Sequence, residues 1–280
     1  MSSFGKRLLL TCTSIPLLFS LIYFLPHYNH LGFVILLLLA VLCGSYEMKN
    51  MLFTKDEKPM LPTWIPMLLP ATQYIEFVFV PHLPLFDIML TFLVLLGFSK
   101  EIFIGGENDF TATFNRVSRS LLLLFYPGFL SIFLVRILFF EQSTLLLLMV
   151  FFLVFGNDTF AYIFGMLFGK NNRNILAVSP NKSIAGFIGG LVTTVLISLL
   201  WVRFVPPMQA IFTTLEAILI GFTIAIISNV GDLIESVFKR AAKVKDSGTI
   251  ILGRGGILDS IDSLLASVPF FTLFVVLCSQ

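Results

Sequence analysis

Two groups of acidic residues at helical spacing flank a basic, glycine-rich turn near the carboxyl end of the chain. On a helix, Asp232, Glu235 and Ser236 fall at positions i, i+3 and i+4, which places them on one face. Asp259 and Asp262 repeat the i, i+3 spacing after the turn. The turn and its approach hold these basic, acidic and glycine residues: Lys239, Arg240, Lys243, Lys245, Asp246, Gly248, Gly253, Gly255 and Gly256. This order of residue types indicates a site for a divalent metal and phosphate groups.

The candidate metal ligands in this segment are all hard oxygen donors, with no Cys or His in reach. Such a donor set favours Mg²⁺ or Mn²⁺ over Zn²⁺. Four bare carboxylates in a membrane would cost roughly 10 kcal/mol, and a bound cation with nearby Lys or Arg removes most of that cost. We therefore assign Mg²⁺, alone or with a second cation, to Asp232 and Asp259, with Asp262 as a further ligand. The alternative is a purely structural helix pair, in which Glu235 and Lys239 form an i, i+4 ion pair.

The composition is that of an integral membrane protein. Of the 280 residues, 57% are hydrophobic and 12% are charged, whereas soluble domains usually carry about 25% charged residues. The net charge of +2 is too small to indicate a nucleic-acid partner. The three cysteines and three histidines show no paired or metal-ligand spacing, so we expect no disulfide and no zinc site.

Long apolar runs recur along the whole chain. A helix needs about 20 apolar residues to cross a hydrocarbon core of roughly 30 Å. We therefore predict an all-α, polytopic integral membrane protein with about nine transmembrane helices. The expected spans are residues 8–25, 31–53, 61–80, 84–105, 118–139, 144–168, 183–205, 210–238 and 256–279. Three prolines stiffen the first half of the third span, so we expect it to be tilted or partly interfacial.

The basic residues predict the orientation of these spans. With the N-terminus in the cytoplasm, all but Arg136 and Arg203 of the 18 basic residues fall at inner ends of the spans. The positive-inside rule therefore predicts a cytoplasmic N-terminus and an outer C-terminus. The glycine-rich turn then faces the cytoplasm, where nucleotides are found. We expect the cytoplasmic membrane of a bacterium as the location.

Polar residues enter the spans themselves only in the second half of the chain. Asn157 and Asp158 follow a run of Phe and Val that should lie deep in the bilayer, where a carboxylate costs about 2.5–3.5 kcal/mol. The small residues Gly156, Gly165 and Gly169 on the same segment would let a neighbouring helix approach closely.

A lysine and a hydroxyl occur at the expected start of the next helix. Lys182 and Ser183 follow a Ser-Pro turn, and the N–H groups at a helix N-terminus form an anion site. Because such groups gather after the middle of the chain, we expect residues 1–150 to be a transmembrane scaffold. Residues 151–280 would then form the catalytic region.

Three segments resemble motifs of the phosphatidate cytidylyltransferases, also called CDP-diacylglycerol synthases. The run SVFKR, followed after four residues by KDSG and then by GRGGILDSID, is similar to the signature of that family. The segments GNDTFAYIFGMLFGKN and SPNKSIAGFIGG resemble two upstream motifs. The chain departs from the family pattern at Leu252, Arg254, Ser260 and Ala185, where Pro, His, Arg and Glu are usual.

The resemblance implies that CTP and phosphatidate react to give CDP-diacylglycerol and pyrophosphate. A phosphatidate oxygen would attack the α-phosphorus of CTP in line, so catalysis would consist of positioning and charge neutralisation. Catalytic roles fall to Asp232, Lys239, Asp246 and Asp259. Substrate-binding roles fall to Asp158, Lys182, Ser183, Ser236, Arg240, Lys245, Gly255 and Gly256. The expected partners are CTP, phosphatidic acid and membrane lipid, with no nucleic acid, and a homodimer stays open.

Other classes of function stay open on the sequence. Intramembrane acids with glycine breaks also occur in ion-coupled transporters, although these should carry related charged segments in both halves, and the first half has none. A nucleotidyltransferase acting on another lipid phosphate, or an inactive relative that binds lipid, would share the same motifs. Whether Asp232 and Asp259 lie within reach of one cation would decide most between these alternatives.

Overall fold

The computed structural model describes residues 16–54, 56–104, 110–173, 176–251 and 255–279. Within these ranges the chain is helical, with no strand and a single isolated bridge between Ile251 and Gly255. Six helices in the described residues are long and apolar enough to cross a membrane. The prediction of an all-α, polytopic membrane protein is therefore confirmed.

Helices lie in the described part of each predicted span. The longest are α2 (His27–Leu52), α4 (Leu85–Ile104), α7 (Ser143–Phe168), α8 (Ile184–Phe204), α10 (Thr214–Ala241) and α11 (Leu258–Cys278). A continuous run is formed by α5 (Thr113–Leu123), the π-helical turn η3 (Leu124–Phe129) and α6 (Leu130–Ile137). The short helix α9 (Pro206–Ile211) precedes α10, and residues 16–24 are also helical. The count of nine membrane spans stays a prediction.

The third and fourth predicted spans explain why that count is open. A 3₁₀ turn, η1 (Ile65–Met67), leads into α3 (Leu68–Phe79), which has only 12 residues, whereas a span needs about 20. Pro66 lies at the start of η1 and Pro70 lies in the first turn of α3, where helices tolerate proline because their first N–H groups have no partner within the helix. Helix α4 is long enough, but it carries three charged residues.

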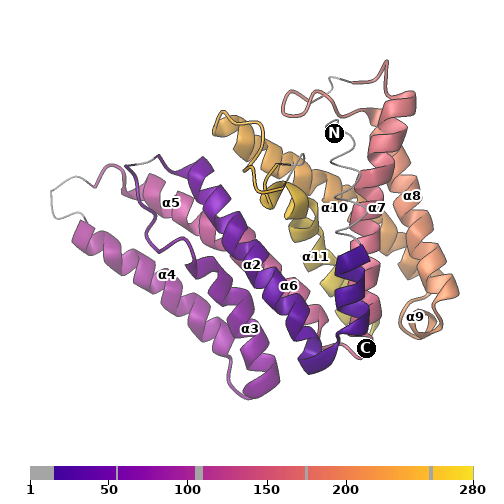
Figure 1. The fold of residues 1–280 in the computed structure, drawn as a ribbon, viewed down its shortest axis with the longest axis horizontal. Coiled ribbons are helices and arrows are strands. Elements are labelled where there is room, and N and C mark those ends of the chain that lie inside the picture. Colours follow the sequence, from indigo (N-terminus) through magenta and orange to yellow (C-terminus); the bar gives the residue numbers. More distant parts are fainter. Residues whose placement is uncertain (1–15, 55, 105–109, 174–175, 252–254, 280) are drawn as a thin grey trace. The chain divides into compact units, whose positions relative to one another are not determined.

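Contacts divide the chain into two compact units, and Figure 1 shows the elements of each. The first unit comprises Met1–Phe139 and Val244–Ser260, and the second comprises Phe140–Lys243 and Ile261–Gln280. Helix α11 begins in the first unit and continues into the second. This is a division by packing, and the predicted functional division at residue 150 stays a prediction.

The first unit has an apolar core that gathers side chains from α3, α4, α6 and η3. Its buried members are Met60, Leu61, Ile65, Leu69, Phe86, Leu93, Leu124 and Ile132. Gly128 in η3 lies against η1 so closely that a Cβ there would come 2.7 Å from the carbonyl oxygen of Pro66. A small residue is therefore required where these two turns meet.

In the second unit, α7 and α10 pack along α8 (Figure 1). A Cβ on Gly156 of α7 would come 2.6 Å from Cδ1 of Ile197, and one on Gly165 would come 3.1 Å from Oγ of Ser183. Gly169 also faces Ser183. The prediction that these three glycines admit a neighbouring helix is confirmed, and that neighbour is α8.

Candidate functional site

The predicted site residues fall into two groups, one in each unit. The second unit holds Asp158, Lys182, Ser183, Asp232, Ser236, Lys239, Arg240 and Asp262. The first unit holds Lys245, Asp246, Gly255, Gly256 and Asp259. Leu252, Gly253 and Arg254 lie outside the described residues. We call the group in the second unit the lysine–carboxylate cluster. We call the described part of residues 245–257, in the first unit, the glycine-rich turn.

Asp232 on α10 is held by a lysine that comes from the start of α8. The Nζ atom of Lys182 lies 2.8 Å from Oδ2 of Asp232, and the two side chains are 29% and 37% exposed. Ser236 donates a long hydrogen bond of 3.4 Å to the other oxygen of Asp232. The structure thus pairs two predicted site residues with each other, in a position that solvent can reach.

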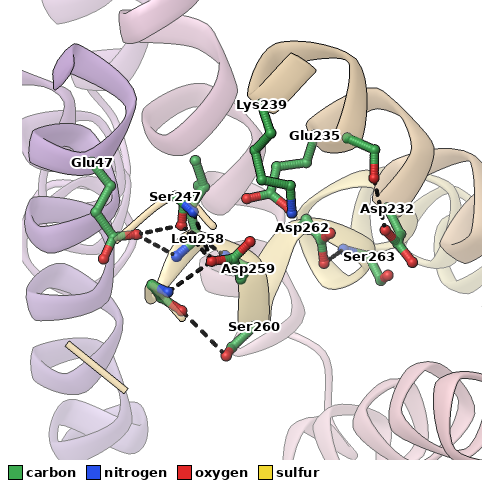
Figure 2. A network of polar contacts seen from close by, with 12 residues as sticks. Glu47, Asp232, Glu235, Lys239, Ser247, Leu258, Asp259, Ser260, Asp262 and Ser263 are labelled. Carbon is green, nitrogen blue, oxygen red and sulfur yellow. Dashed lines mark hydrogen bonds and ion pairs between the residues drawn. The ribbon is translucent and has the colours of Figure 1, made fainter. Parts of the chain in front are cut away.

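The ion pair that the sequence left open is present one turn further along α10. Nζ of Lys239 lies 2.6 Å from Oε2 of Glu235, whose side chain is fully buried (Figure 2). A buried carboxylate is costly unless it is paired, so Lys239 has a structural task whether or not it also contacts substrate.

Asp262 is a further buried acid of this cluster. It is 5% exposed, and its Oδ1 accepts the backbone N–H of Ser263 at 2.6 Å. The side chains of Glu235, Asp232 and Asp158 lie near Asp262. Four carboxylates therefore share one region with two ion-paired lysines. A divalent cation would balance the remaining charge.

A buried amide network connects α7, α8 and α10 of this unit. Asn157 on α7 is fully buried and donates to Oγ of Ser228 at 3.2 Å. Its Oδ1 accepts 3.4 Å hydrogen bonds from Asn229 on α10 and Thr194 on α8. Ser228 in turn donates to Asp158 at 3.3 Å. The network satisfies polar groups at lipid depth, and sequence reasoning found Asn157 and Asp158 but missed their partners.

In the first unit, the glycine-rich turn is organised around a carboxylate that sequence reasoning missed altogether. Glu47 on α2 is 4% exposed. Its Oε1 accepts the N–H of Ile257 at 2.9 Å, and its Oε2 accepts the N–H of Leu258 at 2.8 Å and the hydroxyl of Ser247 at 3.0 Å (Figure 2). An acid two residues from Lys49 near the end of a span looks like an ordinary interface residue, so the residues around Glu47 carry little signal of this role.

Asp259 closes the same turn from the first turn of α11. Its Oδ2 accepts the N–H of Ser247 at 2.9 Å, the hydroxyl of Ser247 at 2.9 Å and the N–H of Gly256 at 2.7 Å. Gly255 has φ of +108°, and a Cβ there would collide with Asp259. These glycines therefore let the backbone approach carboxylates of the chain itself, and their predicted approach to phosphate stays a prediction.

Comparison with known proteins places this arrangement in a family. A model of the cytidylyltransferase family matches residues 5–278. The chain belongs to the cytidylyltransferase family. Over 130 residues it is 44% identical to the phosphatidate cytidylyltransferase of Haemophilus influenzae. The aligned region covers 46% of this chain and 45% of that protein.

Two further relatives extend the comparison. The chain is 40% identical over 132 residues to the phosphatidate cytidylyltransferase of Staphylococcus aureus, covering 46% of this chain and 48% of the relative. It is 30% identical over 199 residues to an uncharacterized protein of Escherichia coli, YnbB, covering 69% of this chain and 65% of the relative. The chain thus spans about half the length of the phosphatidate cytidylyltransferases it matches.

The remaining predicted residues of this cytidylyltransferase-family chain have local roles or face solvent. Ser183 is the N-cap of α8, and its Oγ accepts the N–H of Gly186 at 3.1 Å. Its predicted place at a helix N-terminus is confirmed, and its predicted contact with substrate stays a prediction. Arg240 is exposed and donates to the carbonyl oxygen of Val178 at 3.2 Å. Lys245 and Asp246 are exposed, so an anionic substrate can reach the basic side chain.

The donor chemistry of the lysine–carboxylate cluster fits a divalent cation. Its acids are hard oxygen donors, and they outnumber the lysines that pair with them. No three His, Cys, Asp or Glu side chains of the described residues already converge as a metal site. Magnesium usually takes one or two carboxylates and completes its shell with water and substrate phosphates. The prediction that Asp232 and Asp259 share a cation joins residues of different units and stays a prediction.

Proposed function

We propose that this protein transfers the cytidylyl group of CTP to phosphatidate, forming CDP-diacylglycerol and releasing pyrophosphate. The observation that carries the proposal is the match to the cytidylyltransferase family over residues 5–278. The printed name of its relatives in Haemophilus influenzae and Staphylococcus aureus supports the choice of substrates. A charged cluster set among helices apolar enough to cross a membrane supports a substrate that is itself a lipid with a phosphate headgroup.

The chemistry that we assign to the chain is exchange of ion-pair partners. In the structure, Lys182 neutralises Asp232 in a half-exposed pair. An incoming phosphate can take over the ammonium group, because charge-assisted hydrogen bonds to phosphate are as strong as those to carboxylate. Asp232 is thereby released to ligate a cation. Binding of the anionic substrate and of the metal would then support each other.

We assign Mg²⁺ to Asp232 and Asp259, with Asp262 as a further ligand. When bound, it would neutralise the charge on the triphosphate during attack by the phosphatidate oxygen. Arg240 and Lys245, both exposed, would attract the nucleotide and orient its phosphates. The bond from the α-phosphorus to the new oxygen forms as the bond to pyrophosphate breaks, so atoms balance without a further reactant.

We further place the reaction on the cytoplasmic face of a bacterial inner membrane. The positive-inside distribution of basic residues supports this orientation, and CTP is available on that side. Cysteine labelling of single-Cys variants at Lys58 and Lys245 from either side of sealed vesicles would test it. Both positions are exposed and should react from the cytoplasmic side only.

The function is tested with the purified full chain in detergent. CTP labelled in the α-phosphate, phosphatidate and Mg²⁺ should give CDP-diacylglycerol and one equivalent of pyrophosphate. Parallel reactions receive diacylglycerol, which lacks the phosphate, or a polyprenyl phosphate, and another contains EDTA in place of Mg²⁺. Product from the polyprenyl phosphate alone would move the activity to another lipid phosphate. Absence of transfer to every lipid phosphate would overturn the proposal.

A further inference from the structure

Glu47 is a buried acid near the end of an apolar helix, and it is stabilised by N–H groups and a hydroxyl. Two of its donors are the backbone N–H groups of Ile257 and Leu258. They belong to the start of α11, where N–H groups have no partner within the helix and carry partial positive charge. Glu47 therefore caps α11 from another helix.

This contact joins parts of the chain that lie far apart in the sequence. Glu47 and Ser247 are separated by 200 positions, and both belong to the first unit. The helices before residue 140 therefore also shape the glycine-rich turn, because one of them, α2, supplies the carboxylate that holds the turn.

Ser247 links Glu47 to Asp259. Its Oγ lies 3.0 Å from Oε2 of Glu47 and 2.9 Å from Oδ2 of Asp259. A serine hydroxyl has one proton to donate, so it can satisfy only one of the two acids at a time. The backbone N–H of Ser247 also donates to Asp259. A substitution of Glu47 would therefore change the hydrogen bonds that the carboxylate of Asp259 accepts.

The glycines of the turn give an independent sign that the turn is shaped around Glu47. A Cβ on Gly248 would come 2.5 Å from Oε1 of Glu47. A Cβ on Gly256 would collide with Oε2 of Glu47 and with Oγ of Ser247. At both positions, one on each side of the turn, a residue larger than glycine would collide with the side chain of Glu47.

We propose that Glu47 is a positioning residue for the transfer reaction: it clamps the glycine-rich turn and the start of α11, and so fixes the orientation of Asp259. The inference rests on the proposed function, because Asp259 is assigned there to the reaction centre. Glu47 itself contacts neither substrate in this account and acts through Ser247 and the N–H groups of α11.

The test is Glu47→Gln in the full-length protein. Both oxygens of Glu47 accept hydrogen bonds, whereas a glutamine has one acceptor oxygen and one NH₂ group. The NH₂ group of the glutamine would therefore point at an N–H or O–H donor of the turn, and that hydrogen bond would be lost. We expect kcat to fall by about 10- to 100-fold, the range seen when residues that orient a metal ligand are removed. The KM values for CTP and phosphatidate should change by no more than about threefold.

Glu76→Gln is the matched control. Glu76 is another acid of the first unit that holds the start of a helix, since its Oε2 accepts the N–H of Phe86 in α4 at 2.6 Å. It lies outside the glycine-rich turn. We expect wild-type kcat from this variant. A similar loss of kcat in both variants would mean that Glu47 matters only for general stability, which would overturn the proposal.

A second variant keeps the proposal testable if Glu47→Gln folds poorly. Ser247→Ala removes the hydroxyl that links Glu47 to Asp259. It leaves both backbone hydrogen bonds of Glu47 and the backbone hydrogen bond of residue 247 to Asp259 in place. We expect it to lower kcat as well, and the double variant to be no worse than the poorer single variant, because coupled residues are not additive. Wild-type kcat in Ser247→Ala would overturn the proposal.

Hydrogen exchange supplies a readout that does not depend on activity. Amides of residues 247–258 should exchange faster in Glu47→Gln than in the wild type, with no change in Glu76→Gln. Unchanged exchange together with wild-type kcat would overturn the clamp. If the wild type transfers no cytidylyl group but the exchange responds as expected, the proposed function fails while the clamp stands.

Discussion

The acids of the two units are satisfied in different ways. In the first unit, Glu47 and Asp259 accept hydrogen bonds from backbone N–H groups and from Ser247. In the second unit, Asp232 and Glu235 are ion-paired with lysines. Backbone N–H groups cannot leave without unfolding the turn, whereas a lysine can swing to another anion.

This difference indicates two separate tasks for acids that the sequence motif presents as a single site. The first-unit acids stabilise the shape of the turn, and the second-unit acids are paired with lysine ammonium groups. In the proposed function, a substrate phosphate would compete for these ammonium groups. Asp259 is connected with both tasks, because it closes the turn and also lies in the first turn of the helix that carries Asp262. Four substitutions can break or sharpen this comparison.

The largest effect is expected from Asp259→Asn. If Asp259 is a ligand in the reaction, loss of its charge should lower kcat/KM by about 100- to 1,000-fold, since metal-held charge stabilisation is worth several kcal/mol. Asparagine still has an oxygen that can accept from Gly256 and Ser247, so the turn can persist. The measurement is cytidylyl transfer at saturating Mg²⁺, with the melting temperature as control. Near wild-type turnover would refute the metal assignment and leave Asp259 as a purely structural acid.

Lys239→Met should have the next largest effect, and it should act on stability. It leaves Glu235 buried without its lysine, which costs about 3–5 kcal/mol for a pair of this kind. The double variant Glu235→Leu/Lys239→Met removes both charges and should regain most of that stability. Thermal unfolding in detergent measures both. If the double variant is as unstable as the single one, the pair is not the source of the loss.

Lys182→Met should affect activity more than stability, because its pair with Asp232 is half-exposed. A hydrogen bond to a charged group is worth about 1.5–3 kcal/mol, so we expect kcat/KM to fall by about 10- to 150-fold. Lys182→Arg keeps the charge and should lose less. Lys58→Met removes an exposed lysine outside both groups and should have no effect. Equal activity of Lys182→Met and Lys58→Met would show that no substrate phosphate uses Lys182.

The smallest effect is expected from Ser183→Ala. Loss of an N-cap hydroxyl costs about 1 kcal/mol, which should appear as a small fall in melting temperature. Thr213→Ala is the matched control, since Thr213 caps α10 in a capping box with Glu216. If Ser183 also binds a substrate phosphate, its variant should raise KM while Thr213→Ala does not. Equal KM values in the two variants would confine Ser183 to capping.

The amino-acid sequence by itself determined the helices and the class of the protein, a polytopic membrane protein. It also indicated most of the charged and polar residues that we assign to the proposed site. Long apolar runs predict membrane helices because the bilayer requires backbone hydrogen bonds to be made within each segment. Local rules also placed Ser183 at a helix N-terminus, identified Lys239 as the i, i+4 partner of Glu235, and indicated the glycines of α7 as a packing face. Each of these needs only neighbours within a few residues or a general property of lipid.

Only the tertiary structure decided which acid meets which donor. The pairing of Lys182 with Asp232 joins two helices, and the clamp from Glu47 to Ser247 spans 200 positions. No helical period encodes such contacts, because they depend on how helices lie against one another. Glu47 therefore looked like an interface residue in the sequence, and became the centre of the turn only when folding brought the start of α11 to its carboxylate.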